Sequence, residues 1–342
     1  MSGIRKKTAV ITGVNGQDGS YLSELLLDKG YHVIGVIRRS SQPEFQSHRL
    51  DECRVSDHPG FEYVYGDLLD ISSLIDILKK YAPSEIYNLA AQSHVGISFS
   101  QPLLTTQVDA VGTLNLLEAF RKTVPTARFY QACSSEMFGN SIDDDGYQRE
   151  TTPMTPVSPY GCAKLYSYNI CRTYRDAYGL FISNGILFNH ESPRRGLNFV
   201  TNKVIDAAVK ISKKKQDKLY LGNLDACRDW GHAKDYVKAM WMMLQAPKSD
   251  DFVCATGESR SVRELCSFVF SYLNLNYQDY VEMDSKYVRP EELDALKGDP
   301  SKLKRVLGWE PNYNFGDLML QMIRWRAAFH DDALFTPDLQ YP

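Results

Sequence analysis

Apolar, β-branched runs alternate along the first half of the chain with stretches in which leucine and isoleucine recur at helical spacing. The first two runs are Thr8–Thr12 and Tyr31–Ile37, and each is typical of a buried strand. Between them, Leu22, Leu25 and Leu26 would lie on one face of a helix. The pattern therefore predicts a strand, a helix and a second strand at the start of the chain.

The same alternation continues to about residue 187. Later strands are expected at Phe61–Gly66, Glu85–Ala91, Arg128–Ala132 and Phe181–Leu187, and helices around residues 71–78, over Leu103–Thr123 and from Pro159 onward. Because strands that alternate with helices form a parallel sheet covered on both faces, we expect a doubly wound α/β fold of the Rossmann type. Such sheets bind ligands at the C-terminal ends of their strands, so the residues that follow the strands are the site candidates.

Other stretches do not follow this alternation. Ser41–Gly60 is polar and is expected to be a surface excursion. Val262–Asn274 has helical spacing, and Leu303–Trp309 is expected to form a final small helix. Residues 331–342, which include two prolines, are expected to form a loosely ordered tail.

Composition narrows the class of protein. The formal net charge of −3 over 342 residues gives no electrostatic case for binding nucleic acid or an anionic membrane. The seven cysteines show no C-x-x-C pairing, so we expect reduced intracellular thiols and neither a disulfide framework nor a metal site. No signal peptide and no apolar stretch of about 20 residues is apparent, which predicts a cytoplasmic protein.

A glycine-rich loop joins the first strand to the first helix. Gly13, Gly16 and Gly19 have the spacing G-x-x-G-x-x-G, with Gln17 and Asp18 between the last two. A pyrophosphate needs bare backbone N–H groups close by, and the N-terminus of a helix favours an anion. Three glycines can also simply make a turn, but their place between a strand and a helix favours nucleotide binding.

The end of the second strand indicates which nucleotide. An NAD site usually has an acidic residue there for the ribose 2′-hydroxyl, whereas this chain has Arg38, Arg39 and Ser40. Two guanidinium groups and a hydroxyl suit a 2′-phosphate, so we expect NADP. The alternative is that the arginines are a solvated surface pair.

Two further strand ends carry candidate cofactor contacts. Asp67 and Leu68 could hold an adenine through the carboxylate and the apolar side chain, although the acid could equally be the N-cap of the following helix. Ala90, Ala91 and Ser93 are small and would let a cofactor approach the end of the fourth strand closely. A simple tight connection would explain the small residues equally well.

Tyr160 and Lys164 form the candidate catalytic pair. They stand four residues apart at the start of a predicted helix, so both side chains lie on one face. A nearby ammonium favours the phenolate and would lower the tyrosine pKa. One such pair among 21 tyrosines is about the chance expectation, but this helix follows a strand that ends in Ser134 and Glu136.

Together these features resemble the extended short-chain dehydrogenase/reductases, and finer motifs narrow the resemblance to the GDP-mannose 4,6-dehydratases. The resemblance runs from Thr8 to about Trp309. It is carried by four stretches: Ile11–Leu22, Tyr87–Val95, Leu187–Gly196 and Arg228–Val237. The chain departs from the family in having Ser134 where threonine is usual, and Cys133 and Cys162 where small residues are usual.

The resemblance implies a reaction in which NADP is reduced and then reoxidised. Tyr160 would take the proton of the sugar 4-hydroxyl while hydride leaves C4, and Lys164 would lower the tyrosine pKa. Ser134 would bond O4. Glu136 would remove the C5 proton, made acidic by the C4 ketone, and help water leave C6 before hydride returns to C6. The product would be GDP-4-keto-6-deoxy-D-mannose.

The resemblance also implies other contacts. Cofactor contacts would come from Gly13, Gly16, Gln17, Asp18, Gly19, Arg38, Arg39, Ser40, Asp67, Leu68, Leu89, Ala90, Ala91, Ser93, Tyr160, Lys164, His190 and Arg195. Substrate contacts would come from Ser134, Glu136, Asn189, Val200, Lys203, Gly222, Arg228, Arg289 and Glu292. Lys203, Arg228 and Arg289 are cations suited to a pyrophosphate, although any one of them alone could be a surface charge.

The expected organisation has two parts. Residues 1–187 would form the NADP-binding domain, to which residues 225–257 return, and residues 188–342 would mainly form a smaller α/β domain for the GDP-sugar. A homodimer or homotetramer is expected. The rival functions are a nucleotide-sugar epimerase or 4-ketoreductase, and a non-catalytic NADP-sensing protein. A secondary activity, NADPH-dependent reduction of the 4-keto product to GDP-D-rhamnose, is also compatible with the chemistry.

Overall fold

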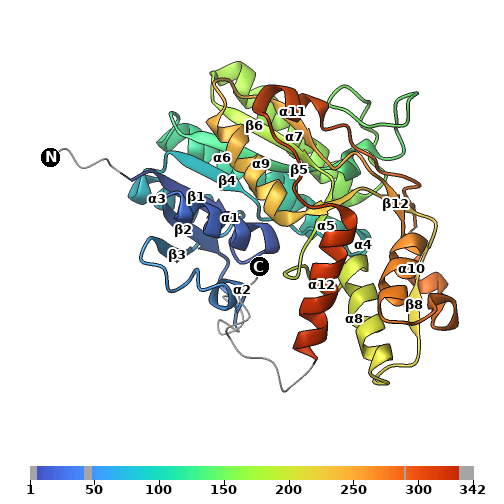
Figure 1. Ribbon diagram of the computed structural model, residues 1–342. Helices are drawn as coiled ribbons and strands as arrows, with labels where there is room; N and C mark the ends of the chain where they lie inside the picture. The colour runs from blue at the N-terminus through green and yellow to red at the C-terminus, as the bar shows by residue number, and fades with distance from the viewer. Residues whose placement is uncertain (1–5, 42–47, 289, 331–342) are drawn as a thin grey trace.

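A seven-stranded, fully parallel sheet forms the centre of the molecule (Figure 1). The computed structural model describes residues 6–41, 48–288 and 290–330. Along the sheet the strands follow the order β11-β6-β5-β4-β1-β2-β3. Their bounds are β1 Thr8–Thr12, β2 His32–Ile37, β3 Phe61–Tyr65, β4 Glu85–Asn88, β5 Arg128–Ser134, β6 Ile182–Leu187 and β11 Asp251–Cys254. The predicted doubly wound α/β class is confirmed, and the order changes direction between β1 and β4, where such folds bind ligands.

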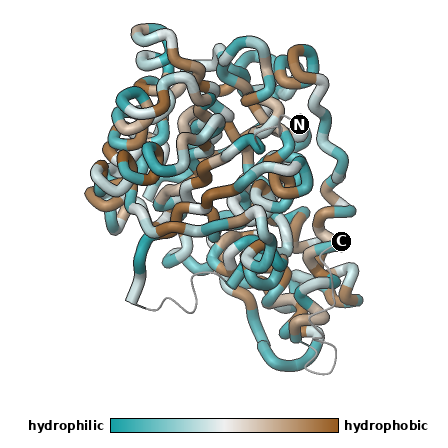
Figure 2. Tube along the Cα trace, turned by 90° about the vertical axis from the view of Figure 1, so that its left-hand side faces the viewer, coloured by the Kyte–Doolittle hydropathy of each residue, from teal (hydrophilic) through white to brown (hydrophobic). Residues whose placement is uncertain are grey.

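Helices cover both faces of this sheet. On one face α1 (Gln17–Asp28) and α9 (Ala233–Gln245) share a core with β1 and β2. On the other face α3 (Ile71–Tyr81), α6 (Gly112–Thr123) and α7 (Pro159–Tyr178) enclose a second core. Figure 2 shows the hydrophobic segments gathered in the interior of this part of the molecule. The predicted strands and helices up to residue 187 are therefore present, with ends shifted by a few residues.

The helix predicted over Leu103–Thr123 is not regular. It begins as α5 (Pro102–Thr105), continues as a π-helical segment over Thr106–Val111 and only then becomes α6. A π segment inserts an extra residue into a turn, and such segments occur frequently at functional sites. Its position here turns Asp109 toward the interior, where that side chain is almost completely buried.

The remaining chain builds a smaller unit with its own core. It packs α8 (Val200–Ser212), α10 (Val262–Tyr272) and α12 (Phe315–Phe329) together with β8 (Leu219–Leu221) and β13 (Val281–Met283). The expectation that the last helix lies at Leu303–Trp309 is wrong. That segment forms α11 (Ser301–Leu307), and the longer α12 follows it, with four apolar side chains buried in this core.

Short elements complete the described chain. They are α2 His48–Glu52, α4 Val95–Ser100, β7 Asn189–Glu191, β9 Cys227–Arg228, β10 Trp230–His232, β12 Arg260–Ser261 and the 3₁₀ turns at Ser135–Phe138, Tyr277–Asp279 and Ser285–Tyr287. Ser41–Gly60 is not simply a surface excursion, because Leu50 and Val55 are buried against α1. The predicted tail at 331–342 lies outside the described residues. Among the described helices, none is long and apolar enough to cross a membrane.

Candidate active site

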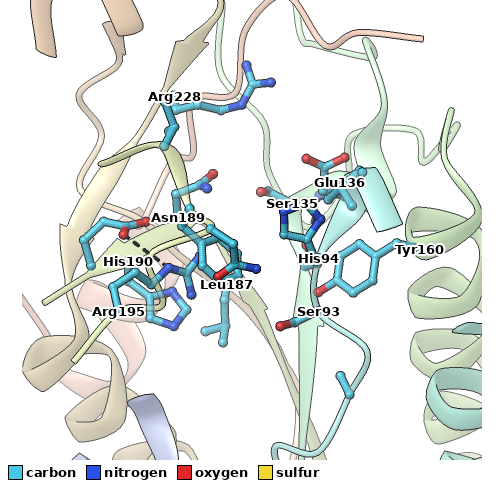
Figure 3. A pocket seen from close by; sticks show the side chains of 18 of the residues that line it. Ser93, His94, Ser135, Glu136, Tyr160, Leu187, Asn189, His190, Arg195 and Arg228 are labelled. Carbon is cyan, nitrogen blue, oxygen red and sulfur yellow. Dashed lines mark hydrogen bonds and ion pairs between the residues drawn. The ribbon is translucent and has the colours of Figure 1, made fainter. Parts of the chain in front are cut away.

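A cavity of about 840 Å³ runs along the C-terminal ends of β1, β4, β5 and β6. The glycine loop closes one end of it, and side chains of the smaller unit, from α8 to Glu292, close the other. Figure 3 shows its two walls: Ser93, His94, Ser135, Glu136 and Tyr160 project from one side, and residues that follow β6 project from the other. Its volume is in the range of small-molecule and cofactor sites.

The glycine loop is held against the end of β4. Gly13 has φ +66°, and a Cβ there would lie 2.8 Å from the Cα of Ala90, so only glycine fits. Thr12 Oγ1 accepts hydrogen bonds from the backbone N–H groups of Leu89 and Ala90 at 3.1 and 3.2 Å. Gly16, the N-cap of α1, supplies no side-chain cap. The bare start of α1 therefore matches the predicted nucleotide loop.

Asp18 and His190 join this loop to β7. His190 Nε2 lies 2.8 Å from Asp18 Oδ2, and its Nδ1 lies 2.8 Å from the backbone oxygen of Phe188. Since both ring nitrogens face acceptors, both carry hydrogen and the ring is an imidazolium. Burial alone would lower the pKa of His190, but the carboxylate of Asp18 outweighs burial and holds that pKa above its ordinary value. The sequence named both residues but not their pairing.

Gln17 ties the same region together. Its Nε2 donates to the backbone oxygen of His190 at 3.1 Å, and its Oε1 accepts from Ser192 Oγ at 2.7 Å. Arg195, the other predicted cofactor contact after β7, pairs with Glu191 at 3.2 Å and stacks on Phe199 at 3.5 Å. These side chains hold the glycine loop and the chain after β6 in a fixed relation.

The residues expected to select NADP lie at the neighbouring strand ends. Arg38, Arg39 and Ser40 follow β2 and do not line the cavity, and Arg39 lies over the ring of Tyr65 at 5.4 Å. Asp67 accepts from the backbone N–H of Leu69 at 2.9 Å.

The alternative role proposed for Asp67, the N-cap of α3, is wrong. The side chain of Asp70 caps that helix by accepting from the backbone N–H of Ser72. Leu68 is buried in the core that α3 and α6 cover.

Tyr160 and Lys164 lie in the cavity wall on one face of α7, as predicted. Lys164 Nζ donates to the backbone oxygen of Ala132 at 2.9 Å and lies 5.7 Å from the centre of the Tyr160 ring. Ser134, at the end of β5, hydrogen-bonds Tyr160. Its Oγ also accepts from the backbone N–H of Glu136 at 3.2 Å, and this bond opens the short 3₁₀ turn that carries Glu136.

The expectation for the Tyr160 pKa needs correction. Burial raises the pKa of Tyr160, and although the Lys164 ammonium lowers it as predicted, the net result is a pKa above the ordinary value. The nearby carboxylates of Asp109 and Glu136 add to the increase. The free energy lost by burying the phenolate is larger than the free energy gained from one nearby ammonium, so Tyr160 stays protonated in the protein without cofactor.

Asp109 is a buried acid that the sequence analysis did not identify. Its Oδ1 accepts from the backbone N–H of Gln92 at 2.7 Å. Burial raises the pKa of Asp109 to about 6, against the opposing effect of Lys164. The carboxyl group therefore interacts electrostatically with Lys164 from the π segment, which no local sequence pattern predicted.

The far end of the cavity contains most of the predicted substrate contacts. Asn189, Val200, Lys203, Gly222, Arg228 and Glu292 all line it, whereas Arg289 lies outside the described residues. Arg228 and Glu292 pair with each other at 3.3 Å.

Lys203 donates to the backbone oxygen of Tyr220 at 2.7 Å and stacks on Tyr287 at 3.7 Å. No sequence pattern predicted a role for either aromatic residue, or for His94 and Lys286, which also line the cavity.

Sequence comparison gives near full-length matches. The profile of the family described as GDP-mannose 4,6 dehydratase matches residues 10–322. GDP-mannose 4,6 dehydratase 2 of Arabidopsis thaliana is 52% identical over 329 residues, which cover 93% of this chain and 86% of that protein. GDP-mannose 4,6 dehydratase of Homo sapiens is 46% identical, covering 93% of this chain and 91% of that protein.

Similar solved structures share the fold. A dTDP-glucose 4,6-dehydratase from Bacillus anthracis in complex with NAD has a TM-score of 0.81 at 22% identity, covering 93% of this chain and 96% of that one. A UDP-glucose 4-epimerase from Thermotoga maritima with UDP-glucose also has a TM-score of 0.81, at 21% identity, covering 94% and 98%. At this identity the likeness extends to the architecture of sheet and flanking helices.

Proposed function

The chain belongs to the GDP-mannose 4,6-dehydratase family, and we propose that it converts GDP-D-mannose to GDP-4-keto-6-deoxy-D-mannose with a nicotinamide cofactor. It is a nucleotide-sugar dehydratase. One observation carries the assignment of the site: Ser134 at the end of β5, Glu136 on the 3₁₀ turn that follows it, and Tyr160 and Lys164 on α7 line the same cavity as the glycine loop.

The residues present fit such a cofactor. The glycine loop offers backbone N–H groups at the start of α1, and a Cβ at Gly13 would fill the close approach to Ala90. The imidazolium of His190 supplies a positive charge beside this loop. When bound, the cofactor accepts a hydride from C4 of the sugar and later returns it to C6.

We propose NADP in preference to NAD because the residues that follow β2 are Arg38, Arg39 and Ser40. An acidic residue at this position, as is usual in NAD sites, would repel a 2′-phosphate, whereas two guanidinium groups and a hydroxyl suit it. Asp67 and Leu68 at the end of β3 would hold the adenine. Leu89, Ala91 and Ser93 would lie along the cofactor, since they line the cavity at the end of β4.

The protein's own groups would move the protons. Tyr160 would first have to lose its own proton, and the Lys164 ammonium together with the positive charge of an oxidised nicotinamide would favour that phenolate against the effect of burial. The phenolate would then accept the proton of the 4-hydroxyl, with Ser134 donating to O4. Once C4 is a ketone, the C5 proton becomes acidic and Glu136 would remove it. The same group would then deliver that proton to the C6 hydroxyl, which departs as water. The proton that Tyr160 takes from O4 would balance the proton that C5 regains after C6 is reduced, so the sugar loses one water in total.

The substrate would extend toward the smaller unit. Asn189, Arg228 and Lys203 would contact the diphosphate, and Glu292, Val200 and Gly222 the nucleoside. Arg289, which lies outside the described residues, is proposed as a further diphosphate contact from the sequence alone. We propose that residues 1–187 together with 225–257 form the cofactor domain, because β11 and α9 pack on the main sheet. A homodimer or homotetramer is proposed as the assembly, supported by exposed apolar side chains at Leu103, Val111 and Tyr166.

Incubation with GDP-mannose followed by mass spectrometry tests this function. The product should be lighter than the substrate by the mass of one water, without net consumption of added cofactor. An epimerase would leave the mass unchanged, and a non-catalytic NADP-sensing protein would leave the substrate intact. Tyr160→Phe is the matched control, because it keeps the aromatic ring and removes only the proton-accepting oxygen.

A further inference from the structure

The hydrogen bonds around His94 assign its protonation state. His94 is the N-cap of α4, and its Nδ1 accepts from the backbone N–H of Ile97 at 3.1 Å. A nitrogen that accepts a hydrogen bond carries no proton, so the proton of the neutral ring is on Nε2. Protonating Nδ1 would place two N–H groups against each other and break the cap. The position therefore favours a neutral imidazole that can donate only through Nε2.

The backbone of His94 is clamped by one side chain. Gln92 Oε1 accepts from the N–H of His94 at 2.9 Å, and Gln92 Nε2 donates to the carbonyl of His94 at 3.2 Å. Gln92 is itself held by Thr105 Oγ1 at 3.0 Å and, through its backbone N–H, by Asp109. A helix cap alone does not need this support. The arrangement fixes where the imidazole points.

The imidazole projects into the cavity. It lies on the wall that carries Ser135, Glu136 and Tyr160 (Figure 3). Its ring centre is 5.8 Å from that of Phe199 at the start of α8, with an interplanar angle of 51°. The ring therefore lies between the wall that carries Tyr160 and the start of α8. A hexose whose C4 meets Tyr160 would lie against the same wall.

We propose that His94 contacts the substrate by donating a hydrogen bond from Nε2–H to a hydroxyl of the hexose. Gln92 acts as a positioning residue that holds this donor in place. The inference rests on the proposed function, since it assumes a hexose next to Tyr160. Because the ring is kept neutral by the cap, His94 acts as a donor for recognition and not as an acid that gives up its proton.

His94→Asn separates this role from the cap. Asparagine is a favoured N-cap residue and can still accept from Ile97 N–H, but it cannot reach the position of Nε2. Binding of GDP and of GDP-mannose should be measured by calorimetry on the holoenzyme, in a Tyr160→Phe background so that the sugar is not consumed. We expect the affinity for GDP-mannose to fall roughly 2- to 13-fold, as for the loss of one neutral hydrogen bond, and the affinity for GDP to stay unchanged.

The chain offers a matched control. His232 is also an N-cap, of α9, where its Nδ1 accepts from the backbone N–H of Lys234 at 3.0 Å, but it does not line the cavity. His232→Asn should leave both affinities unchanged. Gln92→Ala should weaken GDP-mannose selectively as well, because it loosens His94 without removing the ring. Gln92→Ala therefore provides a second measurement of the same role if His94→Asn does not fold.

With Tyr160 intact, His94→Asn should raise KM for GDP-mannose and leave the pH profile of kcat unchanged. Unchanged affinity for GDP-mannose would overturn the proposal, as would equal losses for GDP and GDP-mannose. A shifted pH profile would show that His94 titrates, and would contradict the neutral donor. A wild type that binds GDP-mannose but releases no dehydrated product would reject the proposed function and leave the binding test of His94 valid.

Discussion

His190 Nε2 lies 2.8 Å from Asp18 Oδ2, although the two residues are 172 positions apart in the chain. The net charge at the glycine-loop end of the cavity therefore depends on the proton that His190 and Asp18 hold between them. With that proton present, the pair is neutral overall and His190 presents an imidazolium to the glycine loop. Without it, the carboxylate of Asp18 stands uncompensated where a pyrophosphate is expected to bind, and the two anions would repel each other.

The pair predicts a pH-dependent cofactor affinity. The pKa of His190 is raised in the folded protein, so its stabilising contribution is complete below the ordinary imidazole pKa and is lost as the pH rises through the raised value. Cofactor affinity should fall over the same interval, because Asp18, whose pKa is lowered despite its burial, stays a carboxylate there and loses its counter-charge. Titration with NADP across this range checks the prediction.

Asp18→Asn provides the comparison, since an amide cannot hold the imidazolium. Loss of the His190 proton then exposes no anion, so the fall in cofactor affinity should be smaller and should occur at lower pH. An affinity that is independent of pH in the wild type would contradict the assigned charge of His190.

Glu136→Gln should remove dehydration and leave cofactor binding nearly intact, because the carboxylate acts on the sugar and lies away from the glycine loop. General acid–base groups contribute about 10²–10⁴-fold to rate. Loss of turnover, measured by the mass of the product, should fall in this range while NADP titration stays unchanged. Retention of more than about a tenth of wild-type turnover would exclude this role for Glu136.

Arg38→Ala with Arg39→Ala should weaken NADP selectively by at least roughly tenfold, since charge-assisted hydrogen bonds to the 2′-phosphate would be lost. NAD affinity should change little, because NAD lacks that phosphate. Arg305→Ala with Arg324→Ala, an exposed pair on α11 and α12, controls for the change in net charge. Equal losses for the two cofactors would show that Arg38 and Arg39 do not read the phosphate.

Supplying the 4-keto product with excess NADPH should give slow reduction to GDP-D-rhamnose. The ketone at C4 would lie beside Tyr160, where C4 was first oxidised, and microscopic reversibility allows the reverse transfer. Tyr160→Phe should abolish this reduction together with dehydration. The measurement is the decrease in nicotinamide absorbance over hours, and a rate equal to the control without sugar would leave the protein a dehydratase only.

Gly13→Ala should disrupt cofactor binding and destabilise the fold by more than about 1 kcal/mol. The added Cβ would lie 2.8 Å from the Cα of Ala90, in addition to the strain of alanine at φ +66°. Gly179→Ala isolates the strain, because Gly179 has φ +64° and nothing within 4 Å of its Cβ position. Thermal unfolding should show a larger loss for Gly13→Ala; equal losses would mean that the close approach to Ala90 is unimportant.

Local patterns in the sequence were sufficient for the strands and the main helices of the first 187 residues, but not for the π segment at Thr106–Val111 or for the packing of Leu50 and Val55 within Ser41–Gly60. Strand and helix periodicities depend on neighbours a few positions away, and so does the placement of Tyr160 and Lys164 on one face of α7. The glycine spacing placed the nucleotide loop for the same reason. The helix α12 could also have been predicted from the sequence, because Leu318, Met319, Met322 and Ile323 recur at helical spacing.

Contacts between distant segments were decided only by the tertiary structure. Asp18 meets His190, Gln92 meets Asp109 through the π segment, and Arg228 meets Glu292, and no local spacing connects the members of these pairs. The pKa of Tyr160 likewise depends on contacts with distant segments. The sequence shows the lysine four residues away and hence the direction of its effect, but burial is the sum of everything that packs around the phenol. Those atoms come from segments throughout the chain, so only the folded structure determined that burial outweighs Lys164.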